Sequence, residues 1–256
     1  MSERFAGKVC LVTGASSGIG RATAIAFGQQ GASVIVADMN AQAGEEVAAE
    51  IKRNGSDAIF VPVNISQLKD VEHMVSVAVS RFGRLDCAVN NAAISGSVTL
   101  PTNEYPEDEW NRVIAVNLTG TWYCVKQVLD QMLKQGCGTI VNVSSAAGLR
   151  GHSGNVSYAA AKHGVVGLTK TAALECATKN IRVNAVCPTG IETPMMLDGR
   201  RNLRNDPKAY EDAANYQAMK RLGKPQEVAD VILWLSSEES TFITGHAMAI
   251  DGGAFA

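Results

Sequence analysis

Apolar positions along this chain follow two alternating patterns. Short runs rich in valine, isoleucine and alanine alternate with longer segments whose apolar residues recur at helical spacing. The short runs predict strands at 9–13, 33–37, 58–63, 85–90, 139–143, 182–187 and 247–250. The longer segments predict helices at 17–30, 42–53, 67–82, 107–134, 157–178 and 225–236.

The predicted strands are continuously apolar, which is typical of parallel strands covered on both faces. Their alternation with helices favours a doubly wound α/β fold with right-handed crossovers and about seven parallel strands. No linker or repeat divides the sequence, so we expect one continuous domain over residues 1–256. Residues 195–221 break the alternation, and inserted segments of this kind are often lids over a binding site.

Charge and composition give no indication of a nucleic-acid-binding, membrane, secreted or metal-binding protein. The formal net charge is -2, which gives no electrostatic reason to expect nucleic acid or an anionic membrane as a partner. No apolar run reaches the roughly 18 residues of a membrane span, and the N-terminus lacks the pattern of a signal peptide, so we expect a cytoplasmic protein. Neither the six cysteines nor the four histidines show ligand spacing, so we expect reduced thiols and no metal site.

A glycine-rich turn, Thr13-Gly-Ala-Ser-Ser-Gly-Ile-Gly20, connects the first predicted strand to the first predicted helix. Glycines here let the backbone approach a pyrophosphate, and the helix N-terminus supplies free N–H groups and a positive dipole. The spacing of Gly14, Gly18 and Gly20 differs from G-x-G-x-x-G. The position of the turn between a strand and a helix nevertheless favours dinucleotide binding over a simple tight connection.

Asp38 ends the second predicted strand. A carboxylate at this point can accept hydrogen bonds from the adenosine ribose and repel a 2′-phosphate. Neither Ser17 nor Met39 offers a compensating positive charge, so the sequence favours NAD over NADP. The alternative is that Asp38 only caps the following helix.

Tyr158 and Lys162 stand four residues apart in a predicted helix, and therefore one turn apart on the same face. A neighbouring ammonium favours the phenolate and lowers the pKa of a tyrosine, which can then exchange a proton with an alcohol or a carbonyl. This pair alone is a weak signal, because many helices contain it by chance.

Taken together, these motifs resemble those of the short-chain dehydrogenase/reductase family in its compact form, over almost the whole chain. The glycine motif matches Thr13–Gly20, and the Asn-Asn-Ala-Gly motif appears as residues 90–93 with alanine in the last position. Asn117, Ser145, Tyr158 and Lys162 match the family's catalytic residues, with Ser145 thirteen positions before Tyr158. The resemblance implies a Rossmann-type fold.

The resemblance also implies hydride transfer between NAD and a secondary alcohol or ketone. Ser145 would hold the substrate oxygen, Tyr158 would exchange the proton, and Lys162 would lower the pKa of Tyr158 and bind the nicotinamide ribose. Asn117 would anchor a water that links Lys162 to solvent.

Two sets of site residues follow. The expected cofactor site comprises Gly14, Ser16, Ser17, Gly18, Ile19, Gly20, Asp38, Met39, Asn64, Ile65, Asn91, Ala92, Ala93, Tyr158, Lys162, Pro188, Gly190, Ile191 and Thr193. The expected substrate contacts are Ser145, Tyr158, Ile94, His152, Thr189, Met195 and Met196.

The chain departs from the family pattern at two positions. Thr189 replaces the glycine that usually follows Pro188, and Gly190 comes one place later, which leaves the local backbone path open. Asn64 stands where the family often has aspartate, and its side-chain oxygen can still accept a hydrogen bond from the adenine amino group.

We interpret the segments that are expected to contact the substrate as mostly apolar, which favours a cyclic or medium-sized alcohol or ketone. Arg200, Arg201, Arg204 and Lys208 also lie in segment 195–221, but nearby acidic residues offset them, so we interpret them as a solvated surface. The long helices 107–134 and 157–178 are expected to form a homotetramer, as in relatives of the family.

Two other functions remain open. One is a reductase of carrier-bound 3-oxoacyl groups that uses NADPH, against which Asp38 speaks. The other is a non-catalytic NAD sensor or scaffold, which would not need Ser145, Tyr158 and Lys162 together.

Overall fold

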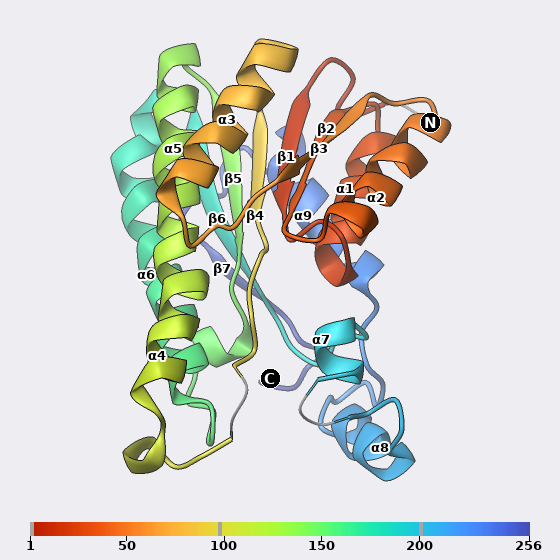
Figure 1. Ribbon diagram of the computed structural model, residues 1–256, viewed down its shortest axis with the longest axis vertical. Coiled ribbons are helices and arrows are strands. Elements are labelled where there is room, and N and C mark those ends of the chain that lie inside the picture. Colours follow the sequence, from red (N-terminus) through yellow and green to blue (C-terminus); the bar gives the residue numbers. More distant parts are fainter. Residues whose placement is uncertain (1–2, 97–98, 200–201) are drawn as a thin grey trace.

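The computed structural model describes residues 3–96, 99–199 and 202–256, in which seven parallel strands form one sheet between two layers of helices (Figure 1). The strands are β1 Val9–Thr13, β2 Ser33–Asp38, β3 Ala58–Pro62, β4 Cys87–Asn90, β5 Gly138–Val143, β6 Ile181–Pro188 and β7 Ala247–Ile250. The helices are α1 Gly18–Gln29, α2 Ala41–Arg53, α3 Leu68–Phe82, α4 Glu107–Ile114, α5 Thr121–Gln135, α6 Val156–Cys176, α7 Pro194–Leu197, α8 Pro207–Asn215 and α9 Pro225–Ser236.

The strand order β3-β2-β1-β4-β5-β6-β7 confirms the doubly wound Rossmann-type sheet. β1 pairs with β2 on one side and with β4 on the other. The chain runs outward from β1 to β3 and then crosses back to β4, so the strand order reverses between β1 and β4. Ligands of open α/β sheets bind outside the carboxyl ends of the strands at such a switch point. The fold therefore places the glycine-rich turn, which follows β1, at the expected binding edge.

Two apolar layers hold the helices to the sheet. Cys10 and Val12 of β1 face the layer shared with α1, α2 and α9, whereas Val9 and Leu11 face the layer shared with α3, α5 and α6. Both faces of the strand are thus buried, which explains why the strand sequences are continuously apolar.

The helix expected at 107–134 is interrupted. α4 and α5 are separated by a stretch of wider, π-helical turns over Ala115–Gly120. Asn117 lies in this stretch, and its side chain binds the backbone of Ile94 in the loop after β4. π-bulges frequently occur at functional positions, and this one directs an amide to a neighbouring loop.

Segment 195–221 contains two helices that the sequence analysis did not predict. α7 and α8 each begin with a proline, and each is preceded by a side-chain cap: Thr193 accepts from the Met196 amide and Asp206 from the Ala209 amide. A cap followed by proline is a helix-start signal. The two helices share a small core around Leu203, Ala213 and Leu222.

The six cysteines are free thiols, five of them buried and Cys137 partly buried, as expected. Among the described residues, no helix combines the length and the apolar character that crossing a bilayer requires.

Candidate active site

A cavity of about 1050 Å³ opens at the carboxyl ends of the strands. Its wall includes every residue of the expected cofactor and substrate sites except Gly20, and among the expected catalytic residues only Asn117 is not part of it. Gly20 and Asn117 therefore lie behind the wall and do not line the cavity.

The glycine-rich turn is shaped by close backbone approaches. Gly14 has a φ of +65°, and a Cβ on it would lie 2.8 Å from the Ala92 Cα. Gly18 has a φ of +54°, and a Cβ there would lie 3.2 Å from the Thr193 side chain. A Cβ on Gly20 would lie 2.0 Å from the Gly14 carbonyl oxygen, so Gly20 packs the first helix against the turn. The turn thus keeps its backbone bare toward the cavity, as a bound pyrophosphate requires.

Asp38 is held with its carboxylate at the cavity. One oxygen accepts from the Ser16 amide at 3.0 Å and the other from the Asn40 amide at 2.9 Å. The cap of α2 is Asn40, which accepts from the Ala43 amide, so the alternative that Asp38 caps this helix is wrong. A carboxylate has about four acceptor positions, and the two backbone bonds leave capacity for ribose hydroxyls.

Asn64 is placed in the wall, but its oxygen is engaged. Oδ1 accepts from both the Ser66 amide and the Ser66 hydroxyl, at 3.1 and 2.8 Å. Because these two donors already occupy the oxygen, an adenine amino group would compete with Ser66 for it, and the adenine role of Asn64 stays a prediction.

Asn91 has a structural task as well. Its Nδ2 donates to the carbonyl oxygens of Thr13 and Gly14, at 3.1 and 3.0 Å, which ties the loop after β4 to the turn after β1. Ala92 and Ala93 then present small side chains to the cavity beside this tie.

The departure at Pro188-Thr189-Gly190 has a local reason. Gly190 has a φ of +60°, so the residue that needs to be glycine in this chain is 190, not 189. A Cβ on Gly190 would also lie 2.0 Å from Nε2 of Gln217. Thr193 follows with its amide bound to the Ile191 carbonyl at 2.8 Å, and its hydroxyl caps α7.

Tyr158 and Lys162 lie one turn apart on α6, and the Lys162 ammonium is 5.5 Å from the centroid of the Tyr158 ring. Lys162 is only 2 % exposed, and its Nζ donates to the Val143 carbonyl at 2.8 Å. Burial lowers the pKa of Lys162 from 10.5 to about 8. The lysine thus lies beside the phenol, as the sequence predicted, and the structure adds that it is desolvated.

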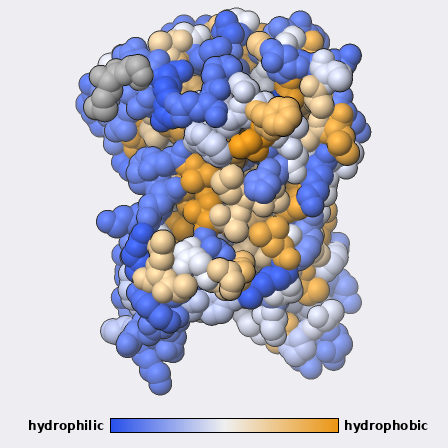
Figure 2. Space-filling model, turned by 180° about the vertical axis from the view of Figure 1, so that it is seen from behind, coloured by the Kyte–Doolittle hydropathy of each residue, from blue (hydrophilic) through white to orange (hydrophobic). Residues whose placement is uncertain are grey.

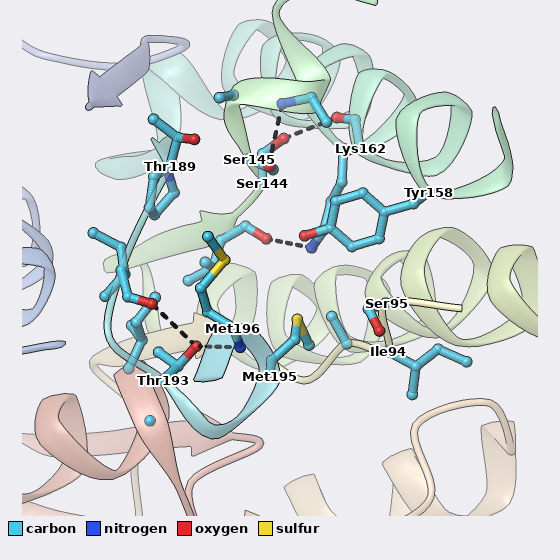
Figure 3. A pocket seen from close by; sticks show the side chains of 18 of the residues that line it. Ile94, Ser95, Ser144, Ser145, Tyr158, Lys162, Thr189, Thr193, Met195 and Met196 are labelled. Atoms are coloured by element: carbon cyan, nitrogen blue, oxygen red, sulfur yellow. Dashed lines mark hydrogen bonds between the residues drawn. The ribbon is translucent and has the colours of Figure 1, made fainter. Parts of the chain in front are cut away.

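Ser145 completes this group from the end of β5. Its hydroxyl accepts from the Ala147 amide at 3.1 Å, which fixes the start of the short 3₁₀ turn Ala146–Gly148. Figure 3 shows Ser145, Tyr158 and Lys162 gathered in one part of the cavity, with Thr193, Met195 and Met196 in another. A substrate oxygen between Ser145 and Tyr158 would meet a hydrogen-bond donor and a proton-exchanging group at once.

Asn117 is fully buried, and both ends of its amide are used. Oδ1 accepts from the Ile94 amide and Nδ2 donates to the Ile94 carbonyl, each at 2.8 Å. The side chain therefore positions Ile94, which lines the substrate end of the cavity. The expected water link to Lys162 stays a prediction.

A buried polar chain connects the sheet to the catalytic helix. Asn90 of β4 donates to Asn142 of β5 at 2.8 Å, and Asn142 donates to the Thr169 hydroxyl of α6 at 2.9 Å. Buried polar groups of this kind require partners, so the chain fixes the position of α6 against the strand ends. This structural role of Asn90, Asn142 and Thr169 was not predicted from the sequence. An asparagine inside an otherwise apolar strand was the signal that could have indicated it.

Other wall residues were not named individually by the sequence analysis, although Tyr216 and Gln217 belong to the expected lid segment 195–221. Arg150, Gln217 and Phe255 line the cavity, together with Tyr216 from the segment after α8. His152 also lines it but is exposed, with Nδ1 near the Ser153 carbonyl. Of the basic residues noted in segment 195–221, Arg204 is paired with Asp198, and Arg200 and Arg201 lie outside the described residues.

Comparison with known proteins identifies similar chains. Residues 14–254 match the family model described as enoyl-(acyl carrier protein) reductase. The chain is 43 % identical to the 3-oxoacyl-[acyl-carrier-protein] reductase FabG of Thermotoga maritima over 98 % of both chains. It is 42 % identical to a cyclohexanol dehydrogenase of Acinetobacter sp., covering 98 % of this chain and 96 % of the relative.

A short chain dehydrogenase/reductase of Aspergillus oryzae, astE, is 42 % identical, with 96 % of this chain and 94 % of the relative covered. Among solved structures, NAD+-bound xylitol dehydrogenase superposes with a TM-score of 0.93 at 35 % identity, over 98 % of this chain and all of that chain.

Proposed function

The chain belongs to the short-chain dehydrogenase/reductase family, and on that premise we propose that it transfers a hydride between NAD(H) and a secondary alcohol or ketone. It is an oxidoreductase of the class that acts on alcohols and ketones. The observation that carries the finer proposal is the desolvated Lys162 one turn from Tyr158, in the same cavity as Asp38 and the bare glycine turn.

The cavity fits a dinucleotide. Gly14 and Gly18 let the turn pack closely against Ala92 and Thr193 without side chains of its own, and the turn leads into the N-terminus of α1. Thr193 lies next to Gly18, where the glycine turn and the loop after β6 approach each other, and Ile191 belongs to the same loop. Bound there, NAD would supply the hydride acceptor in oxidation, and NADH the donor in reduction.

The chain's own residues supply the proton chemistry. In oxidation Tyr158 would take the proton of the substrate hydroxyl while the carbon-bound hydrogen leaves as hydride, and in reduction Tyr158 would return the proton to the oxygen. The nearby Lys162 cation favours the phenolate form of Tyr158. Ser145 would donate a hydrogen bond to the oxygen and stabilise its developing negative charge.

Asp38 supports NAD as the cofactor. A 2′-phosphate would meet its carboxylate, and no lysine or arginine of the described residues forms an ion pair with Asp38. Like-charge contact at this point would disfavour NADP. The relative crystallised with NAD+ is consistent with this choice.

The substrate end supports a carbon skeleton of moderate size. Ile94, Met195 and Met196 contribute apolar side chains to the wall, and methionine adapts its shape to different ligands. Two relatives are named for cyclohexanol and levodione. These features favour a cyclic or medium-sized alcohol or ketone.

A second candidate is the reduction of 3-oxoacyl groups bound to a carrier. It is favoured by the 43 % identity with the Thermotoga reductase and disfavoured by the carboxylate of Asp38, because such reductases usually take NADPH.

The test measures initial rates with NAD and with NADP across neutral secondary alcohols, diols and sugars, and with NADPH on an acetoacetyl thioester. We expect turnover of at least one alcohol with NAD. Turnover of the thioester alone with NADPH would establish the second candidate. Tight NADH binding without turnover of any substrate would instead make the protein a sensor.

A further inference from the structure

Arg150 brings a positive charge to the substrate end of the cavity. It lies in the cavity wall, just after the 3₁₀ turn that begins at Ser145. The Gly148 amide donates to the Ser145 carbonyl at 2.8 Å, and the Arg150 amide donates to the Ala146 carbonyl at 3.3 Å. The backbone of Arg150 is therefore held at a fixed place relative to the serine that would hold the reacting oxygen.

Two aromatic rings orient the guanidinium. Its Cζ lies 3.7 Å from the ring centroid of Phe255 and 5.4 Å from that of Tyr216, and these two rings meet edge to face at 6.5 Å. A guanidinium that stacks on aromatic rings keeps its N–H groups free around the edge of the plane. Stacking thus fixes the cation without using its hydrogen-bond donors.

The rings come from two segments that are tied together. Tyr216 follows α8, and Phe255 belongs to the C-terminal tail. The Met219 amide donates to the Gly252 carbonyl at 3.0 Å, so the tail and the segment after α8 are joined beside the cavity. Arg150 connects both to the loop that carries Ser145.

Arg150 lacks a compensating charge. Seven arginines of the described ranges form ion pairs with carboxylates: Arg4, Arg21, Arg81, Arg84, Arg112, Arg204 and Arg221. In the same ranges, no carboxylate lies within 4.0 Å of Arg150, although Asp212 belongs to the same cavity wall, and no oxygen accepts a hydrogen bond from its guanidinium. Because Arg150 is exposed at the cavity wall and its guanidinium has no acceptor among these residues, a ligand in the cavity can provide one.

We propose that Arg150 determines specificity by binding a carboxylate on the substrate, at the end remote from the reacting carbon. The preferred substrates would then be hydroxy acids and the corresponding oxo acids, an inference that rests on the proposed dehydrogenase function. A guanidinium binds a carboxylate through two parallel N–H···O bonds, which fixes orientation as well as distance. The apolar wall of Met195 and Met196 would hold the carbon chain between the two ends.

The main experiment compares each of a series of medium-chain hydroxy acids with its methyl ester, which keeps the shape and removes the charge. The variants are Arg150→Gln, Arg150→Lys and, as a matched control, Arg53→Gln, which removes an exposed arginine at the end of α2. We expect wild-type enzyme and the control to prefer the acid by about tenfold or more in kcat/KM, as a charge-assisted bidentate contact implies. Arg150→Gln should lose this preference through KM, and Arg150→Lys should keep part of it.

The neutral esters separate the two proposals. If wild type and Arg150→Gln turn over the esters equally, the dehydrogenase chemistry is intact in the variant. A loss of the preference for the acid is then caused by the removal of the Arg150 guanidinium. If wild type does not distinguish acid from ester, or if Arg150→Gln slows both equally, the carboxylate proposal is wrong while the dehydrogenase function stands. A preference for neutral thioesters over the acids would also overturn it.

A binding measurement keeps the inference testable without turnover. Calorimetry with hexanoate and methyl hexanoate, each added to the enzyme saturated with NADH, should detect tighter binding of the carboxylate in wild type only. Phe255→Leu, which removes the ring under the guanidinium, should weaken carboxylate binding in the same direction as Arg150→Gln. Equal affinity of wild type and Arg150→Gln for hexanoate would contradict the proposal.

Discussion

The proposed preference for NAD rests at the residue scale on a carboxylate that is placed by its neighbours. The amides of Ser16 and Asn40 hold Asp38 at the cavity, and Asn40 takes over the helix cap that Asp38 would otherwise provide. The side chain is thereby free to act on the ribose rather than on the helix.

Replacement of Asp38 should shift cofactor preference. In Asp38→Ala the repulsion of a 2′-phosphate disappears, so the ratio of kcat/KM for NAD to that for NADP should fall by about tenfold or more, an effect of at least ~1.4 kcal/mol. Asp230→Ala, on the exposed side of α9, serves as a control for a lost carboxylate. An unchanged ratio in Asp38→Ala would show that this residue does not select the cofactor.

The lowered pKa of Lys162 makes the free energy of unfolding depend on pH. Its pKa is about 8 in the folded protein and 10.5 in the absence of burial. Below pH 8 the lysine carries its proton in both states; between pH 8 and 10.5 the unfolded chain keeps a proton that the folded chain has lost. Because the unfolded state binds more protons in this window, this residue's contribution to the free energy of unfolding rises with pH.

The shift corresponds to about 3 kcal/mol between pH 8 and 10.5, since one pKa unit is about 1.36 kcal/mol. The free energy of unfolding of wild type minus that of Lys162→Met should therefore increase across this range, because titrating groups that do not interact with Lys162 cancel in the difference. Urea unfolding at several pH values measures it. A difference that stays constant, or that falls with pH, would mean that Lys162 is not desolvated.

Single residues also mark the limits of sequence analysis. Asp38, Ser145, Tyr158 and Lys162 were found because their chemistry and spacing are local signals, and all four line the cavity. The engaged oxygen of Asn64 was missed because its partner, the neighbouring Ser66, competes for the same lone pairs. Arg150 and Phe255 could not be paired from the sequence, since only the tertiary fold brings the tail to the loop after β5.

At the scale of elements, close packing between the glycine turn and α1 shapes the cofactor end. Gly20 lies in the first turn of α1 directly against the Gly14 carbonyl, and no side chain fits between them.

The predicted strand cores were accurate because continuous apolar runs identify buried parallel strands. The π-helical break after α4 was not predictable, because it depends on the contact between Asn117 and the distant Ile94.

Gly20→Ala should therefore damage both stability and cofactor binding. The added Cβ would lie 2.0 Å from the Gly14 oxygen and must displace backbone, which costs about 1–3 kcal/mol. Gly167→Ala is the matched control on α6, where a Cβ meets nothing within 4 Å and the change should stabilise the helix by about 0.5–1 kcal/mol. An unfolding midpoint and an NADH affinity unchanged in Gly20→Ala would refute this packing role.

At the scale of the whole molecule, exposed apolar surface remains outside the cavity. Trp122 and Leu133 of α5 are about half exposed and Leu174 of α6 is 83 % exposed. On the opposite face, where α9 and the outer strand β7 lie nearest the viewer, Figure 2 shows an apolar area at mid-height. Such patches mark interaction sites in many proteins, and the homotetramer expected from the sequence stays a prediction.

Charge placed on the helical surface should disrupt that assembly. Trp122→Glu and Leu174→Glu are expected to shift the mass in light scattering from tetramer to dimer or monomer, whereas Lys69→Glu on α3 should leave it unchanged. A wild-type protein that is monomeric at micromolar concentration would show that these surfaces serve another purpose.

The central claim is that Tyr158 exchanges the proton in a hydride-transfer reaction. The most direct test compares wild type and Tyr158→Phe for NAD-dependent oxidation of the best neutral alcohol, with NADH affinity measured on both. The account predicts a loss in kcat of at least about a hundredfold in the variant, because proton transfer by a positioned side chain contributes about 10²–10⁴-fold, together with an NADH affinity close to that of wild type. Turnover by Tyr158→Phe near the wild-type rate would contradict it.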